Sequence, residues 1–334
     1  MAKEQNVKNY SAGTNSNLGL QILWAKELFY DEGADPDGQR PRHVRAGSGL
    51  ASFGTKLVGV QDDADFLAFI DPDGMSVRGS ALEAGSASHR LYDDRDETAD
   101  AEEKVDLEAC LIVPGDDEAT ILSFGSGVSE KRRRLVLTRV NGETVEHSEY
   151  VTIDFHQALA EPLESRGGAL NLEGAVYFPS LSVIRVFSRG DHGENPFDAT
   201  MDVSWDELKA YLEQPLGVPV PRPFHLRRYD LGTLDGRPLT FSDAERVGEG
   251  CLVTVSSESD DKAGGSLIGY MDSEGELTLA RGDCFPVEGK LEGLSFLASN
   301  SARLFAIEDQ DDFEKASRLY ELKLIGEWPG ELAT

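Results

Sequence analysis

The chain has little cysteine: three residues among 334, far apart in the sequence. Cys110, Cys251 and Cys284 lack the paired spacing of a thiolate metal site, and they are too few for a disulfide framework. The sequence also lacks any run of 18 apolar residues, and its first 17 residues are polar, without the apolar centre of a signal peptide. We therefore expect buried free thiols and a soluble cytoplasmic protein.

Basic residues are scarce as well. Lys and Arg number 32 against 61 Asp and Glu, which gives a formal net charge of −29. A nucleic acid or an anionic membrane needs a basic patch on its partner, so we expect neither. The acidity favours cations or cationic partners, or it serves only as a solubilising surface. The sequence does not fix the oligomeric state, and a monomer is compatible with it.

What the sequence does contain is one unit repeated five times. Each unit opens with a short segment in which a polar residue stands among small ones; these openings are Arg45–Phe53, Asp106–Val113, Asn171–Phe178, Thr240–Val247 and Lys290–Leu297. Two further apolar-alternating runs follow in each unit, and in the third unit the second of them is His225–Asp230. Repeats of three or four short strands are typical of a β-propeller, because one blade cannot bury its own faces. We predict an all-β fold, a single five-bladed propeller, with six blades as the alternative.

The last unit supplies only three strands before the chain ends at Thr334. The apolar-rich run Leu18–Tyr30 is predicted to close the ring as the outermost strand of the last blade. We expect a flexible N-terminus over 1–17, the propeller over 18–326 and a tail over 327–334. An insertion over 191–223 is predicted to hold one helix, because Ser204-Trp205-Asp206-Glu207 has the form of a capping box.

Four of the five inner strands are predicted to begin with a carboxylate near the central channel. These residues are Glu108, Glu173, Asp243 and Glu292, and Ser48 takes the corresponding place in the first unit. Like charges in a confined space stay ionised only if a cation, a basic side chain or water compensates them. We predict a divalent cation there, Ca²⁺ in preference to Mg²⁺, because Ca²⁺ accepts oxygen ligands in a tolerant geometry. Alternatively, each carboxylate accepts backbone N–H groups of the next blade and holds the ring together.

A second set of polar residues follows the second strand of each unit, at one rim of the ring. The predicted ligand-binding residues are Asp62, Ser126, Arg132, Arg134, Arg189, His192, Glu258 and Asp309. Arginine can bind phosphate or carboxylate through two N–H donors at once, so we predict a small anionic ligand. His192 is a candidate general base. The alternative for Arg132 and Arg134 is pairing with surface acids along one strand face, for His192 it is a surface histidine without this role, and for the others it is an ordinary polar turn.

Several of these motifs together resemble an uncharacterised bacterial β-propeller family. They are the Leu-Glu-Gly openings at Leu172–Ala175 and Leu291–Leu294, the turn Gly125–Ser129 and the closing stretch Glu308–Asp312. That family is distantly similar to phytase-like, esterase-like and gluconolactonase-like propellers. The resemblance implies acidic residues that hold calcium beside a phosphate ligand, or a glutamate opening an inner strand that helps bind one channel metal. Either implication falls on Glu108, Glu173, Asp243 and Glu292.

Three functions remain open on the sequence. The first is the binding of a divalent cation and a small ligand, without chemistry. The second is a metal-dependent hydrolase of phosphoesters or lactones, in which the cation polarises the reacting oxygen. The third is a non-catalytic scaffold for protein interactions. A hydrolase needs an open coordination position that faces a pocket, whereas a structural metal is enclosed by protein ligands.

Overall fold

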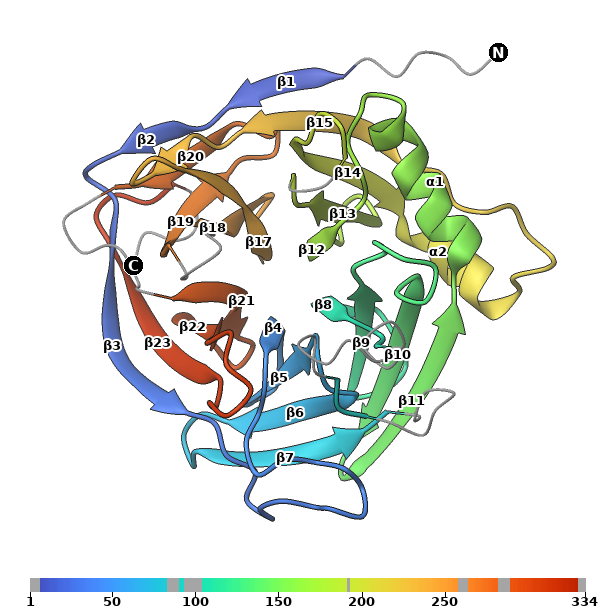
Figure 1. The fold of residues 1–334 in the computed structure, drawn as a ribbon, viewed down its shortest axis with the longest axis vertical. Helices are drawn as coiled ribbons and strands as arrows, with labels where there is room; N and C mark the ends of the chain where they lie inside the picture. Colours follow the sequence, from blue (N-terminus) through green and yellow to red (C-terminus); the bar gives the residue numbers. More distant parts are fainter. Residues whose placement is uncertain are drawn as a thin grey trace.

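The computed structural model describes residues 7–82, 90–92, 104–190, 193–257, 264–281 and 289–329. Five separate sheets stand around a central axis, and the innermost strands β4, β8, β12, β17 and β21 face one another across it (Figure 1). The predicted all-β propeller with five blades is confirmed, and the alternative of six blades is wrong. Within the described part of the chain, no helix is long and apolar enough to cross a membrane.

Each blade runs from an inner strand outward. The first blade comprises β4 (Gly47–Phe53), β5 (Lys56–Gln61), β6 (Phe66–Asp71) and β7 (Ser76–Ala81); the second comprises β8 (Leu107–Val113), β9 (Ala119–Gly125), β10 (Arg134–Asn141) and β11 (Thr144–Val151). The third comprises β12 (Leu172–Phe178), β13 (Val183–Ser188), β14 (Asp198–Ser204), β15 (Phe224–Asp230) and β1 (Lys8–Ser11). The fourth comprises β17 (Arg237–Val247), β18 (Gly250–Ser257), β19 (Ser266–Met271), β20 (Leu277–Ala280) and β2 (Gly13–Asn15), with β16 (Thr233–Leu234) beside β17. The fifth comprises β21 (Lys290–Leu297), β22 (Asn300–Asp309), β23 (Arg318–Ile325) and β3 (Gly19–Glu27).

The N-terminal segment closes the ring. As predicted, β3 pairs antiparallel with β23 and completes the last blade. The expected flexible terminus is corrected over residues 8–15, because β1 and β2 pair in parallel with β15 and β20. These two strands cover the outer edges of the third and fourth blades, which would otherwise expose unpaired backbone groups. At the other end, Trp328 of the expected tail is buried against the fifth blade.

The expected insertion over 191–223 also needs correction. It contains a full strand, β14, so that β15, which was expected as the third strand of its blade, is the fourth. Strand β14 alternates apolar side chains at Ala199, Met201 and Val203, the period of a strand. The predicted helix is confirmed as α2 (Trp205–Glu213), where the Ser204 hydroxyl accepts the N–H of Glu207 at 3.3 Å.

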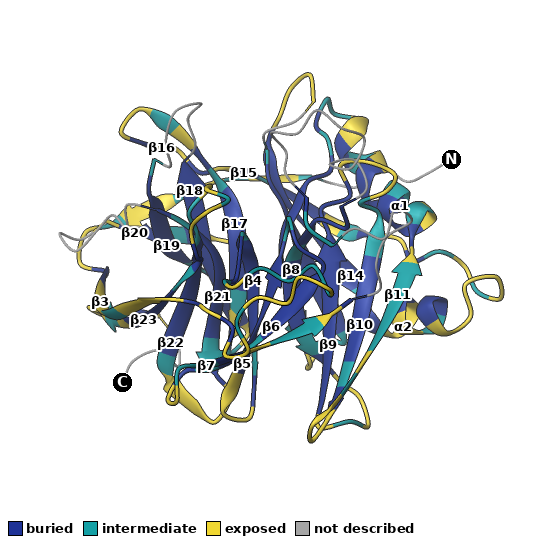
Figure 2. Cartoon of the chain, turned by 60° about the horizontal axis from the view of Figure 1, so that its bottom comes forward, coloured by how far each residue is buried: buried dark blue, intermediate teal, exposed yellow. Residues whose placement is uncertain are grey.

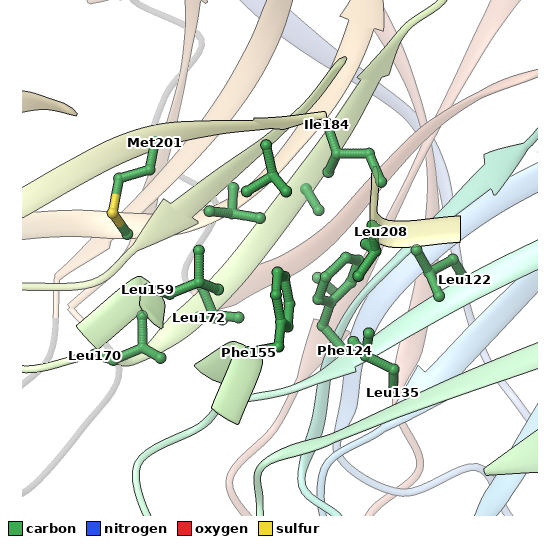
Figure 3. Packing of buried hydrophobic residues seen from close by; sticks show 14 of the residues in the cluster. Leu122, Phe124, Leu135, Phe155, Leu159, Leu170, Leu172, Ile184, Met201 and Leu208 are labelled. Atoms are coloured by element: carbon green, nitrogen blue, oxygen red, sulfur yellow. The ribbon is translucent and has the colours of Figure 1, made fainter. Parts of the chain in front are cut away.

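A second helix, α1 (Ile153–Glu164), was not predicted. It follows β11 and covers the second and third blades, where Phe155, Leu159 and Leu163 join the largest apolar cluster (Figure 3). Their spacing of four residues is the helical signal that the strand pattern obscured. Most buried residues lie in the blades, and most exposed residues lie in the connecting loops (Figure 2). Cys110 and Cys251 are buried free thiols, as expected, and Cys284 lies outside the described residues.

Candidate functional site in the central channel

A β-bulge occurs at one equivalent residue in all five inner strands. The residues that the pairing register skips are Ser48, Glu108, Glu173, Ser242 and Glu292. A bulge adds one unpaired residue to a strand and re-aims its side chain, and bulges often lie beside functional sites. The repeated opening therefore places three glutamates and two serines at one level of the channel.

Some of the bulged residues are followed by a glycine, which is required for a separate reason. A Cβ atom on Gly293 would lie 2.8 Å from the backbone of Gly49, and one on Gly174 would lie 3.0 Å from Cα of Asp243. Neighbouring inner strands therefore touch at this level, and a side chain would force them apart. The motif Leu-Glu-Gly combines a bulged polar residue with a close approach between blades.

Asp243 is not equivalent to the three glutamates. It lies one residue beyond the bulged Ser242, and a one-residue shift along a strand turns a side chain to the opposite face. Its Oδ2 atom accepts the N–H of Leu294, on the next blade, at 2.6 Å. This contact is of the kind predicted as the alternative, a carboxylate that ties neighbouring blades together, and it sets Asp243 apart from the three bulged glutamates.

Glu108 gathers with two further carboxylates where the first and second blades meet: Asp62, Asp106 and Glu108 are called here the acidic cluster. One oxygen of each lies within 4.8 Å of the others. Asp106 is well paired, since Lys104 Nζ lies 3.0 Å from its Oδ1, Arg132 Nη1 lies 3.0 Å from its Oδ2, and the Ser126 hydroxyl donates to Oδ2. Asp62 is less so. Lys104 Nζ lies 3.5 Å from its Oδ2, while its Oδ1 is buried with no hydrogen-bond partner among the described residues.

The glutamates of the third and fifth blades are compensated by basic side chains. Arg189 Nη2 lies 2.9 Å from Glu173 Oε2 and 3.5 Å from Glu292 Oε1, and its Nε donates to the carbonyl of Phe241 at 3.3 Å. Lys290 Nζ lies 3.5 Å from Glu292 Oε1. Arg189 thus links three blades, because its partners come from β12, β17 and β21.

Burial and mutual repulsion leave several of these carboxyls short of positive charge. Burial raises the pKa of Asp62 to about 8, although Lys104 opposes the shift. Burial also raises the pKa of Glu108 well above its usual range, and the charges of Glu173 and Asp106 add to the effect. The pKa of Asp309 rises for the same reason, with Glu292 and Asp62 as its strongest like-charged neighbours. At neutral pH these carboxyls therefore retain protons unless a cation replaces them.

The predicted rim residues separate into two groups. Asp62, Ser126 and Arg189 are equivalent, because each donates its backbone N–H to the residue that precedes an inner strand, at 3.1, 3.0 and 2.8 Å. With Arg132 and Asp309 they join the channel carboxylates. Arg134 does not, since it pairs with Glu149 on the outer strand β11. His192 and Glu258 lie outside the described residues.

The sequence reasoning missed Lys104, Asp106 and Lys290. Their signal is a period of two: Lys104, Asp106 and Glu108 alternate into β8, and Lys290 and Glu292 do so in β21. In each segment the base contacts the acid two residues further on: Lys104 contacts Asp106, and Lys290 contacts Glu292. Asp106 also has a left-handed backbone, with φ of 59°, which is uncommon for a residue other than glycine.

A cavity of about 910 Å³ opens in this structure, but not at the acidic cluster. It lies at the opposite mouth of the channel, where the last residues of the five inner strands line it. The two mouths thus differ: charged side chains fill one, and the other is open and apolar.

Several solved structures align with the chain at low sequence identity. A β-1,3-galactosidase structure aligns with a TM-score of 0.53 and 9% identity, over 92% of this chain and 63% of that one. A glutaminyl cyclase from Myxococcus xanthus aligns with a TM-score of 0.47 and 9% identity, over 97% and 100% of the chains. Regucalcin, a calcium-binding protein from Agrobacterium tumefaciens, aligns with a TM-score of 0.40 and 8% identity, over 96% and 98%.

No curated protein matches the chain in sequence. One family model does, over residues 43–324, and it is described as a family of unknown function, DUF6929. The match spans the ring from the first blade to the last and confirms the resemblance to an uncharacterised propeller family. The chain belongs to this family of unknown function.

Proposed function

We propose that this propeller binds a divalent cation at the acidic cluster and a small oxyanion beside it. One observation carries the proposal: Asp62 Oδ1 is buried without a hydrogen-bond partner among the described residues, in a group of three carboxylates within 4.8 Å. A buried charged oxygen without a partner costs free energy, and like charges nearby increase that cost. A cation between these oxygens removes both costs.

The donor set suits a hard cation. All three groups are carboxylates, and neither a histidine nor a cysteine is among them. Ca²⁺ takes such oxygens at variable number and angle, and it completes its shell with carbonyl groups and water, whereas Mg²⁺ holds its own waters in an octahedron. We therefore expect Ca²⁺ to bind more tightly than Mg²⁺.

The basic residues around Asp106 support the second half of the proposal. Lys104 and Arg132 contact Asp106 in the absence of a cation. Once a cation neutralises the acidic cluster, their N–H donors can turn to an oxyanion, which Arg binds through two donors. The cation and the anion should therefore bind with positive coupling.

Hydrolysis of phosphoesters or lactones is the second candidate. It is favoured by Lys104 and Arg132, which lie beside the carboxylates and could hold an anionic substrate next to the cation. A bound cation would supply polarisation of the reacting oxygen. Phosphoesters and lactones should be screened with and without Ca²⁺, and turnover should require the cation.

Calorimetric titration tests the cation. Wild-type protein freed of metal is titrated with Ca²⁺ and then with Mg²⁺, beside Asp62→Asn and Glu108→Gln. Glu213→Gln is the matched control, because this exposed residue at the end of α2 carries the same charge away from the channel. We expect one Ca²⁺ per chain, with affinity lowered at least about tenfold in both channel variants and unchanged in the control.

A second titration uses inorganic phosphate as the probe. Phosphate should bind more tightly in the presence of Ca²⁺ than in its absence, and Arg132→Ala should remove the difference. Wild-type protein that takes up no Ca²⁺ would overturn the proposal.

A further inference from the structure

The cavity at the opposite mouth of the channel, called here the far cavity, is built by all five blades. Its wall includes residues from the ends of β4, β8, β12, β17 and β21. The residues that bear on its chemistry are Cys110, Ile112, Tyr177, Glu245, Phe296 and Ala298. At about 910 Å³ it lies within the range of roughly 300–1,000 Å³ that is usual for small-molecule sites.

The far cavity is separate from the acidic cluster. Glu108 and Ile112 are four residues apart on β8, which puts the two sites about 13 Å apart along the strand. The neighbouring inner strands touch at the level of Gly49, Gly174 and Gly293, between the two sites. A ligand in the far cavity therefore does not depend on a cation at the other end.

The wall of the far cavity is apolar but not fully covered. Ile112, Tyr177 and Phe296 are only half-buried, so their apolar surface is partly in water. Covering such surface with an apolar ligand is favourable by roughly 25 cal/mol per Å². Among the described strands, β4, β8, β12 and β21 have no partner on the channel side, and β17 pairs there only at its first residues, with β16, so backbone donors and acceptors border the space.

One acidic side chain lies in this wall among the described residues. Glu245 is half-buried, and its Oε1 accepts the N–H of Phe296 at 3.1 Å. Burial raises the pKa of Glu245 to about 7. Two basic residues also border the cavity, but both are exposed: Arg246, whose Nη1 donates to the carbonyl of Gly248 at 3.2 Å, and Lys323. Of the three charged side chains in this wall, the acidic one is therefore the most buried.

We propose that the far cavity is a second binding site, for a small apolar molecule that carries one protonated amine. The apolar body would cover Ile112, Tyr177 and Phe296, and the amine would pair with Glu245. An amine there would add positive charge beside a carboxylate whose ionisation burial opposes, and the net charge of −29 would favour the approach of a cation.

The test uses three probes of equal chain length: octylamine, octanol and octanoate, each at submillimolar concentration. Binding to the whole protein is measured by calorimetry in chelator, so that the cation site plays no part. We expect octylamine to bind at least about tenfold more tightly than octanol, and octanoate to bind weakest. Tightest binding of octanoate would overturn the proposal by assigning recognition to Arg246 and Lys323.

Two variants complete the test. Glu245→Gln should weaken octylamine at least about tenfold and leave octanol within about twofold, with Glu213→Gln as the charge-matched control. Ala298→Trp, at an exposed position on the cavity wall, should block both probes even if Glu245→Gln fails to fold. Binding of none of the three probes to wild type, or unchanged binding to Ala298→Trp, would overturn the site.

Discussion

The two ends of the central channel are built from the same five strands, yet their chemistry is opposite. At one end, the acidic cluster and its basic partners fill the space with charge. At the other, the far cavity is open and lined mostly by apolar side chains. The bulge accounts for the difference. It re-aims one residue per strand, and beyond it regular alternation resumes, so side chains turn to the neighbouring blades rather than to the axis.

The largest effect should come from removing the strand that closes the ring. Deletion of residues 1–30 removes β3, leaves the outer edge of β23 without a partner and takes Leu23 from the wall of the far cavity. We expect loss of the cooperative unfolding transition in circular dichroism. Deletion of residues 1–17 removes only β1 and β2 and should keep that transition at a lower temperature. A protein without residues 1–30 that melts like wild type would contradict this account of closure.

Next is the loss of Arg189, which compensates two glutamates at the charged end. Arg189→Met should lower the free energy of unfolding by about 3–5 kcal/mol, because it leaves Glu173 and Glu292 buried with less positive charge. Arg246→Met, at the exposed edge of the far cavity, should change it by less than about 0.5 kcal/mol. Urea unfolding measures both variants, and equal effects would remove the contrast between the two ends.

Two acids of the inner strands should respond with opposite signs. Asp243→Ala leaves the N–H of Leu294 without its acceptor and should destabilise by about 1–3 kcal/mol. Glu108→Gln replaces a carboxyl whose ionisation burial and like charges oppose, so in chelator it should not destabilise and should raise the melting temperature. Thermal melts of both variants in chelator provide the measurement. Destabilisation by both would mean that Glu108 is also a structural tie.

The stability of the cation-free protein should depend on pH through Asp62. Its pKa rises from 3.8 to about 8 on folding, so between these values the folded state holds a proton that the unfolded state has released. Stability from this group is therefore full below about pH 4 and is lost as the pH rises through about 8. Asp62→Asn should lose less stability than wild type between pH 5 and pH 8, and Ca²⁺ should reduce the loss in wild type. Parallel pH profiles for the two proteins would contradict the assignment.

The smallest effect should come from Arg134. It pairs with Glu149 at the partly exposed outer side of the second blade, and such pairs contribute less than about 1 kcal/mol. Arg134→Ala should leave the binding of Ca²⁺ and phosphate unchanged, in contrast to Arg132→Ala. Weaker phosphate binding in Arg134→Ala would place this residue in the site after all.

The ring and its closure could be predicted from the sequence, because repeated strand patterns and one unassigned apolar run leave few arrangements. The sequence could not show that Asp243 and Glu108 are not equivalent. A bulge shifts the register by one residue, and nothing in Phe241-Ser242-Asp243 shows which residue is skipped. Only pairing with β18 assigns the bulge to Ser242 and turns Asp243 to the next blade.

The candidate site could be predicted in part. Glu108, Glu173 and Glu292 were evident from the repeated opening, and the residues after the second strands included Asp62 and Arg189. The distribution of basic partners could not be predicted, since Arg189 reaches strands of three blades that are far apart in the sequence. The far cavity left no sequence motif, because it is the common space left by five strand ends.

The most direct test of the cation site compares melting curves in EGTA and in Ca²⁺, for wild type and for the double variant Asp62→Asn with Glu108→Gln. Ca²⁺ at a hundred times its dissociation constant should stabilise wild type by about 2.7 kcal/mol and should leave the double variant unchanged. Identical curves for wild type in EGTA and in Ca²⁺ would contradict the account, and the channel carboxyls would then be groups that share protons and hold the ring together.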